Sequence, residues 1–124
     1  MRSTQLPYQF VLDELESLRP RVKRAFGLIY VYLGDRMLLL MRASDKLPST
    51  NGIWLYTELQ HLESLRREFP SVPRHHFWKS GRNAWVILSA NKGDFEEQAF
   101  KACELILNGD RRIGRVTRGS ISSV

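Results

Sequence analysis

Hydrophobic residues follow a helical spacing in three segments of the chain. In the first segment apolar positions three and four residues apart are separated by acidic residues, which is typical of an amphipathic helix. Thr57 stands where it can cap the second segment, and Asp94 where it can cap the third. Pro20 and Pro70 end the first two segments. The pattern therefore predicts three helices, at Phe10–Leu18, Glu58–Phe69 and Phe95–Leu107.

Short apolar runs between turn-forming residues predict the strands. The stretch from 22 to 43 holds two apolar runs on either side of Gly34-Asp35, a pair that suits a tight turn, and it therefore predicts a β-hairpin. The segment Ser80-Gly81-Arg82-Asn83 supplies a second hairpin turn. The expected strands are Ala25–Leu33, Arg36–Ala43, Ile53–Tyr56, His75–Lys79 and Ala84–Leu88.

These elements follow the order α-β-β-β-α-β-β-α along the chain. A three-strand meander, a crossover helix and a second hairpin can form one mostly antiparallel, five-stranded sheet packed by helices, which is an α+β fold. A chain of 124 residues is long enough for one domain, which we place at residues 1–110. Residues 111–124 are basic and rich in Gly and Ser, and they are expected to form a flexible tail.

The first predicted hairpin is apolar on both of its faces. Strand alternation places four large hydrophobic residues on one face of its first strand: Phe26, Leu28, Tyr30 and Tyr32. A sheet with one wet face shows a polar alternation that this hairpin lacks. Two explanations stay open: the flanking segments cover both faces, or one face binds a partner, most simply a second copy of the chain.

The overall charge points to polyanions. The chain has 19 Lys and Arg against 13 Asp and Glu, a net charge of +6. Such a charge attracts nucleic acid, although many proteins are basic for solubility alone. The single cysteine, Cys103, excludes an internal disulfide and is typical of a reducing cytoplasm. The longest apolar run, Leu28–Leu33, is too short to span a bilayer, and no signal peptide is visible, so we expect a cytoplasmic protein without membrane partners.

Candidate catalytic chemistry is sparse. Adjacent His75 and His76 would point to opposite faces of a strand, and the third histidine, His61, lies elsewhere, whereas a zinc site needs three or four ligands. Cys103 lies on a helix stripe, which indicates a buried side chain rather than a nucleophile. We therefore expect no metal, cofactor or catalytic residue. Three tryptophans are expected in the core or on a sheet face, and one of them would line a ligand cleft if it faced an open sheet surface: Trp54, Trp78 and Trp85.

Residues 65–88 carry a family resemblance. The segment Leu65–Pro73, followed by His75-His76, Lys79 and Trp85–Leu88, resembles the MmcQ/YjbR-like family, and Lys23–Gly27 is similar to the start of TfoX N-terminal domains. The resemblance implies a bacterial protein with a small frataxin-like (CyaY-like) fold, whose two hairpins have been likened to paired wings for DNA. Frataxins carry an acidic, iron-binding face, and the basic charge here argues against iron delivery. The sequence departs from the family pattern at Lys46–Gly52 and at Phe77-Trp78.

The resemblance and the charge lead to a DNA-binding hypothesis. A winged binder lays a hairpin against a groove and contacts phosphates with Arg and Lys, and a ring can press on a base or sugar. On this hypothesis the nucleic-acid-binding residues are Arg24, Arg36, His76, Lys79, Arg82, Asn83, Arg111 and Arg112. Scattered arginines are also ordinary solvated surface. Three functions stay open: a DNA-binding accessory module, a protein-interaction module or homodimer on the Phe26 face, and a small-ligand binder.

Overall fold

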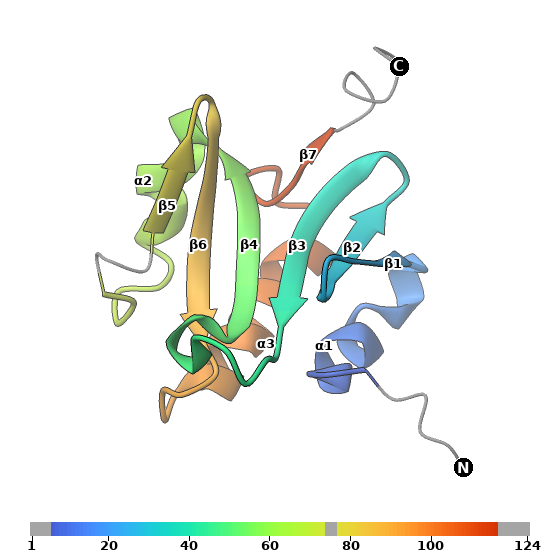
Figure 1. Ribbon diagram of the computed structural model, residues 1–124. Helices are drawn as coiled ribbons and strands as arrows, with labels where there is room; N and C mark the ends of the chain where they lie inside the picture. Colours follow the sequence, from blue (N-terminus) through green and yellow to red (C-terminus); the bar gives the residue numbers. More distant parts are fainter. Residues whose placement is uncertain (1–5, 74–76, 117–124) are drawn as a thin grey trace.

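The computed structural model describes residues 6–73 and 77–116 and confirms the α+β fold class. One antiparallel sheet carries the helices on one side (Figure 1). The helices are α1 (Gln9–Glu14), α2 (Leu62–Arg66) and α3 (Phe95–Leu107), with 3₁₀ turns η1 (Glu16–Leu18), η2 (Pro48–Thr50) and η3 (Leu59–His61). The strands are β1 (Arg21–Ala25), β2 (Leu28–Leu33), β3 (Arg36–Arg42), β4 (Gly52–Glu58), β5 (Phe77–Ser80), β6 (Asn83–Ser89) and β7 (Arg115–Val116).

The sheet has seven strands in place of the predicted five. Six of them are ordered β1-β2-β3-β4-β6-β5, and β7 pairs with the first residues of β3. Strands β3 and β4 pair only from Leu39 to Arg42 on β3, and β7 enters beside the remaining part of β3. The chain after α3 therefore belongs to the sheet as far as Val116, whereas we had expected a flexible tail from residue 111 onward.

The core lies between the sheet and its helices. One cross-strand row, Val31, Leu39, Leu55 and Val86, is almost completely buried. The helices and the segment after α2 supply the other side of the core, with Leu15, Leu65, Phe69, Ala99, Ala102 and Ile106. Burying an aliphatic side chain contributes about 1.5–3 kcal/mol, so this one layer supplies most of the driving force for folding.

The predicted first strand, Ala25–Leu33, is in fact two strands with a turn between them. Phe26 and Gly27 both have positive φ, 55° and 75°, which is the backbone of a two-residue hairpin turn. The placement of Phe26 on a strand face beside Leu28 was therefore wrong, and its side chain is 95% exposed at the turn. Asn-Gly is the usual sequence of such a turn, so the sequence Phe-Gly did not indicate a hairpin turn at this position.

A β-bulge explains why β3 is apolar along its whole length. The register shifts where Val31 pairs with Leu39 but Tyr32 pairs with Met37. The extra residue, Leu38, joins Leu39 in the core, so two consecutive side chains face the helices. Met37 and Leu40 are buried as well but do not belong to that core.

Helix prediction succeeded for the last helix and failed for the second. Helix α3 has the predicted bounds, although the Asp94 carboxylate accepts hydrogen bonds from Ser71 and Gln98 instead of capping the backbone. The predicted helix Glu58–Phe69 is shortened to η3 and α2, because Thr57 is a buried residue of β4 and no helix cap. The predicted helix Phe10–Leu18 is divided into α1 and η1.

Candidate functional site

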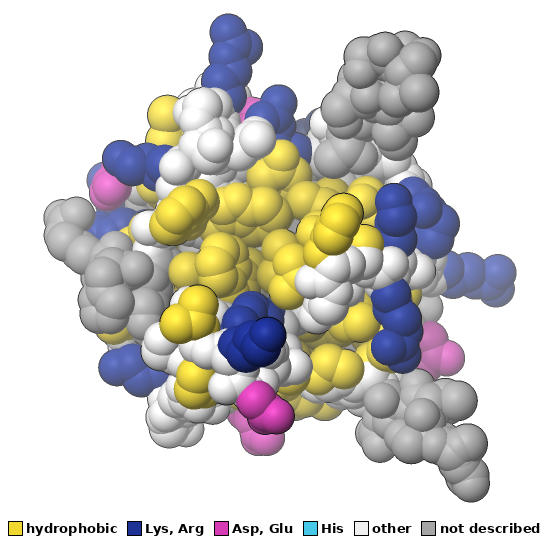
Figure 2. All heavy atoms as spheres, viewed as in Figure 1, with side chains coloured by type: hydrophobic (Ala, Val, Ile, Leu, Met, Phe, Trp, Pro, Cys, Tyr) yellow, Lys and Arg dark blue, Asp and Glu magenta, His cyan; other side chains and the backbone are white. Residues whose placement is uncertain are grey.

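No described helix covers the second face of the sheet, which we call the open face (Figure 1). Its side chains alternate along the strands with those of the core. Figure 2 shows hydrophobic side chains gathered over the central strands, with Lys and Arg side chains along much of the border. The apolar members of the open face are Leu28, Tyr30, Tyr32, Met37, Leu40, Trp54, Tyr56, Trp78, Trp85 and Ile87.

The register arranges these side chains in rows that cross the strands. Tyr30, Leu40, Trp54 and Ile87 are successive partners from β2 to β6. The next row has two parts: Tyr32, Met37 and Arg115 are successive partners on β2, β3 and β7, and Tyr56, Trp85 and Trp78 are successive partners on β4, β6 and β5. Partners on one face of neighbouring strands lie in contact, so the open face is a continuous layer of rings and aliphatic groups.

The rings at the centre of the open face hold one another in place. Tyr56 stacks on Trp85 with 4.3 Å between ring centroids, and Trp54 meets Trp85 edge to face at 6.2 Å. The Trp54 indole also donates a hydrogen bond of 3.0 Å to the Thr50 carbonyl. Burial raises the pKa of the Tyr56 hydroxyl above its ordinary value. The central rings are thus fixed before any partner arrives.

Exposure is graded across this layer. Leu40 and Ile87 are only 6% exposed although no described helix lies over them, because the larger side chains around them exclude water. Tyr30, Tyr32, Trp54 and Trp85 are half-buried. Trp78, on the edge strand β5, is 57% exposed. The open face consequently offers several ring surfaces to a partner, with the most accessible one at its β5 edge.

Basic residues border the rings on the β1 side. Arg21 and Lys23 are partners of Tyr32 and Tyr30, so they lie on the open face. The Arg21 guanidinium lies over the Tyr32 ring, 4.7 Å from its centroid, and donates a hydrogen bond to the Gly34 carbonyl. Lys23 is exposed beside Tyr30. Both cations are therefore placed to meet an anion that rests on the rings.

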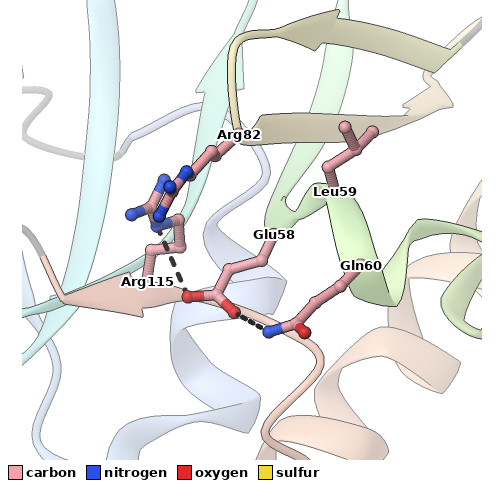
Figure 3. A pocket seen from close by; sticks show the side chains of 5 residues that line it. All are labelled: Glu58, Leu59, Gln60, Arg82 and Arg115. Atoms are coloured by element: carbon pink, nitrogen blue, oxygen red, sulfur yellow. Dashed lines mark hydrogen bonds and ion pairs between the residues drawn. The ribbon is translucent and has the colours of Figure 1, made fainter.

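A cavity of about 300 Å³ opens where β7 approaches the β5–β6 turn (Figure 3). Glu58 forms an ion pair of 3.7 Å with Arg115 and accepts a hydrogen bond from Gln60, and both interactions lower the pKa of its carboxyl. The side chain of Arg82 enters the cavity from the β5–β6 turn, and no described residue pairs with its guanidinium. The cavity therefore has an excess of positive charge.

Two predicted nucleic-acid-binding residues have structural contacts on the core side of the sheet. Nη2 of Arg36 donates hydrogen bonds to the carbonyls of Arg111, Ile113 and Gly114, at 3.1, 2.7 and 2.9 Å. Arg112 forms ion pairs with Asp110 at 2.6 Å and with Glu68 at 2.8 Å, and it also contacts Ser64. Their donors are engaged within the chain, so neither residue belongs to the candidate site.

The other predicted residues are dispersed. Arg24 and Lys79 are exposed on edge strands but lie on the core side, as partners of Ile29 and Ala84. Arg111 is exposed after α3, and its carbonyl accepts the hydrogen bond from Arg36 beside the first hairpin turn. Asn83 accepts a hydrogen bond from Arg115 beside the cavity, next to Arg82. His76 lies outside the described residues. Among the described residues of the predicted set, Arg82 and Asn83 lie together beside the cavity, and Arg36 contacts Arg111 on the core side of the sheet.

Several members of the site were not among the predicted binding residues. Trp54 and Trp85 had been noted without a face, and Tyr56, Arg21 and Arg115 were not in the predicted set. A signal was present, because β4 and β6 are apolar on both faces just as the first hairpin is.

The structure offers little catalytic chemistry in the residues it describes. Among them, no three His, Cys, Asp or Glu side chains come together in a way that could hold a metal ion. Cys103 is buried at 2% exposure, and burial raises the pKa of its thiol to about 12, so the thiolate is not available as a nucleophile. None of the described helices is both long and apolar enough to cross a membrane.

Comparison with known proteins adds no relative to this picture: no protein-family model, curated protein or solved structure matches the chain. The resemblance to the MmcQ/YjbR-like family stays a prediction. The function of the chain must accordingly be argued from the open face and its border.

Proposed function

We propose that the chain is a nucleic-acid-binding module and that the open face of its sheet is the contact surface. The observation that carries the proposal is that rows of aromatic side chains on the open face are bordered by Arg and Lys side chains. Winged binding through the hairpin tips alone, as expected from the sequence, has less support because Arg36 is engaged elsewhere and Lys79 lies on the core side.

Charge is distributed unevenly between the sheet and the helices. Among the described strands, Glu58 is the only acidic residue, and it is already paired with Arg115. Most other carboxylates lie on or beside the helices, on the opposite side of the molecule. The strands carry seven basic residues: Arg21, Lys23, Arg24, Arg36, Arg42, Lys79 and Arg115. A polyanion would therefore approach the sheet with little repulsion.

The same charge makes a homodimer through the open face unfavourable. Two copies stacked face to face would bring Arg21 and Lys23 of each copy into a shared interface without acidic partners. Like charges at an interface cost several kcal/mol. The cavity at Arg82 is at the lower limit of ligand-pocket volumes, and Leu59 is the one apolar residue among the five that line it, so it gives a small-ligand function less support than the open face gives nucleic acid.

Two neighbouring residues of β1 provide a matched test. Lys23 and Arg24 are both exposed and adjacent in sequence, but Lys23 lies on the open face and Arg24 on the core side. Lys23→Glu and Arg24→Glu change the net charge equally. We expect Lys23→Glu to weaken binding of a labelled oligonucleotide by roughly tenfold in fluorescence anisotropy, and Arg24→Glu to have a much smaller effect.

Binding should also weaken steeply between low and near-physiological salt, because contacts to phosphates release counterions. Equal losses in the two variants would mean that the charge attracts nucleic acid without using the open face. Absence of salt-dependent binding would refute the proposal.

A further inference from the structure

We infer that the open face selects single-stranded nucleic acid and stacks unpaired bases on its rings. The inference rests on the proposed function, because it names the substrate class of that same surface. A duplex and a single strand present different chemical groups to a flat layer of aromatic rings.

A duplex hides the faces of its bases. Only phosphates, sugars and the edges of base pairs are accessible, and reading those edges requires an element that enters a groove. The rings of the open face lie in rows across a sheet, and none of them stands on a described helix that could enter a groove. A single strand can turn its bases onto such rings, and stacking accepts any base.

The dimensions of the open face suit several nucleotides. From β1 to β5 it crosses six strands, and a spacing of about 4.8 Å between strands gives a width of about 24 Å. Rings occur along this path at Tyr30 or Tyr32, then at Trp54, Trp85 and finally Trp78. A single strand laid across the sheet would meet cations on β1 and rings on β2, β4, β6 and β5.

Cations stand where the phosphates of such a strand would lie. Arg21 and Lys23 occupy the β1 edge, beside Tyr32 and Tyr30. Arg82 occupies the opposite side, at the cavity beside β6 (Figure 3). Because the guanidinium of Arg82 is without a described partner, it is the donor in the cavity best placed to receive a phosphate. Rings between two groups of cations are the arrangement of a single-strand groove.

The central rings also bind at low entropic cost. Trp85 is held between Tyr56 and Trp54, and Trp54 is held by its hydrogen bond to Thr50. A base that stacks on rings already fixed in this way need not order them, so more of the contact free energy appears as affinity.

The test compares three probes of equal length with the full chain: oligo(dT) of about twelve nucleotides, its duplex with oligo(dA), and an abasic oligonucleotide of the same charge. Binding is followed by anisotropy and by quenching of tryptophan fluorescence. We expect oligo(dT) to bind at least roughly tenfold more tightly than the other two and to quench the tryptophans.

Trp78→Ala removes the most exposed ring of the open face without opening the core, and Phe100→Ala is the matched control, since Phe100 is 43% exposed on α3. We expect Trp78→Ala to weaken oligo(dT) binding by roughly tenfold and to leave the abasic probe unchanged. Thermal unfolding of both variants verifies that they are folded.

The outcomes separate the two proposals. Equal affinity for all three probes would overturn the inference and leave salt-dependent nucleic-acid binding in place. No binding to any probe would refute both, and the open face would then belong to a protein partner.

Discussion

The turn at Phe26-Gly27 provides a quantitative test of the structure. Phe26 has φ 55°, a left-handed conformation in which the Cβ of most residues is strained. Its side chain is 95% exposed and so has almost no burial to lose. Asparagine tolerates this conformation and is preferred before Gly in such a turn. The substitution Phe26→Asn should therefore relieve strain without removing a contact.

The expected gain follows from the backbone alone. The left-handed conformation costs most residues about 1–2 kcal/mol, and asparagine recovers part of it, so we expect Phe26→Asn to stabilise the protein by about 1 kcal/mol. For a chain of this length, that corresponds to an increase in Tm of about 4 °C. Phe26→Ala keeps the strained Cβ and should gain little.

The assay is urea unfolding of the three proteins followed by circular dichroism, with Tm measured in parallel. Gly27→Ala completes the series: Gly27 has φ 75° and nothing within 4 Å of an added Cβ, so its cost, about 1 kcal/mol, would be purely conformational. If Phe26→Ala stabilised the protein as much as Phe26→Asn, exposure of the ring and not backbone strain would be the cause, and the reasoning would fail.

Further predictions concern the ion pairs after α3. Arg112→Ala removes the partner of Asp110 and Glu68, whose side chains are 17% and 28% exposed. We expect it to lower the free energy of unfolding, measured in urea, by about 2 kcal/mol. An unchanged free energy of unfolding would show that solvent replaces these contacts. The Arg112 guanidinium lowers the pKa of both carboxyls, so the stability they supply is complete above about pH 5 and should fall as acid reaches their lowered pKa values. This acid-dependent loss, measured by unfolding between neutral pH and about pH 2, should be smaller in Arg112→Ala, and an unchanged pH profile would contradict the assignment.

The parts of the fold that could be predicted were those with strong local patterns. Helix α3 has a regular apolar stripe and ends at Asn108-Gly109, and its bounds were predicted as observed. Strand β1 was missed because it is an edge strand of mostly charged residues, and such residues protect an edge but give no apolar alternation. Thr57 was misread because a cap is a local feature, whereas its pairing with Ala84 is a tertiary one.

The candidate site was only partly accessible from the sequence. The two-faced apolar character of the first hairpin correctly indicated that a hydrophobic surface needs an explanation. What the sequence lacked was the register that places Trp54, Tyr56 and Trp85 together and sets Arg115 beside Asn83. These contacts join residues far apart in the chain, and no local pattern encodes them.

The hydrogen bonds of Arg36 have a consequence for folding during synthesis. They join β3 to carbonyls as far as 78 positions later in the chain, and β7 completes the sheet beside the same strand. When the chain has been synthesised only as far as the end of α3, the segment that contains β7 and pairs with β3 has therefore not yet been made. Until that segment emerges, a nascent chain leaves the backbone of β3 unpaired there, which is the point at which a chaperone would be most useful.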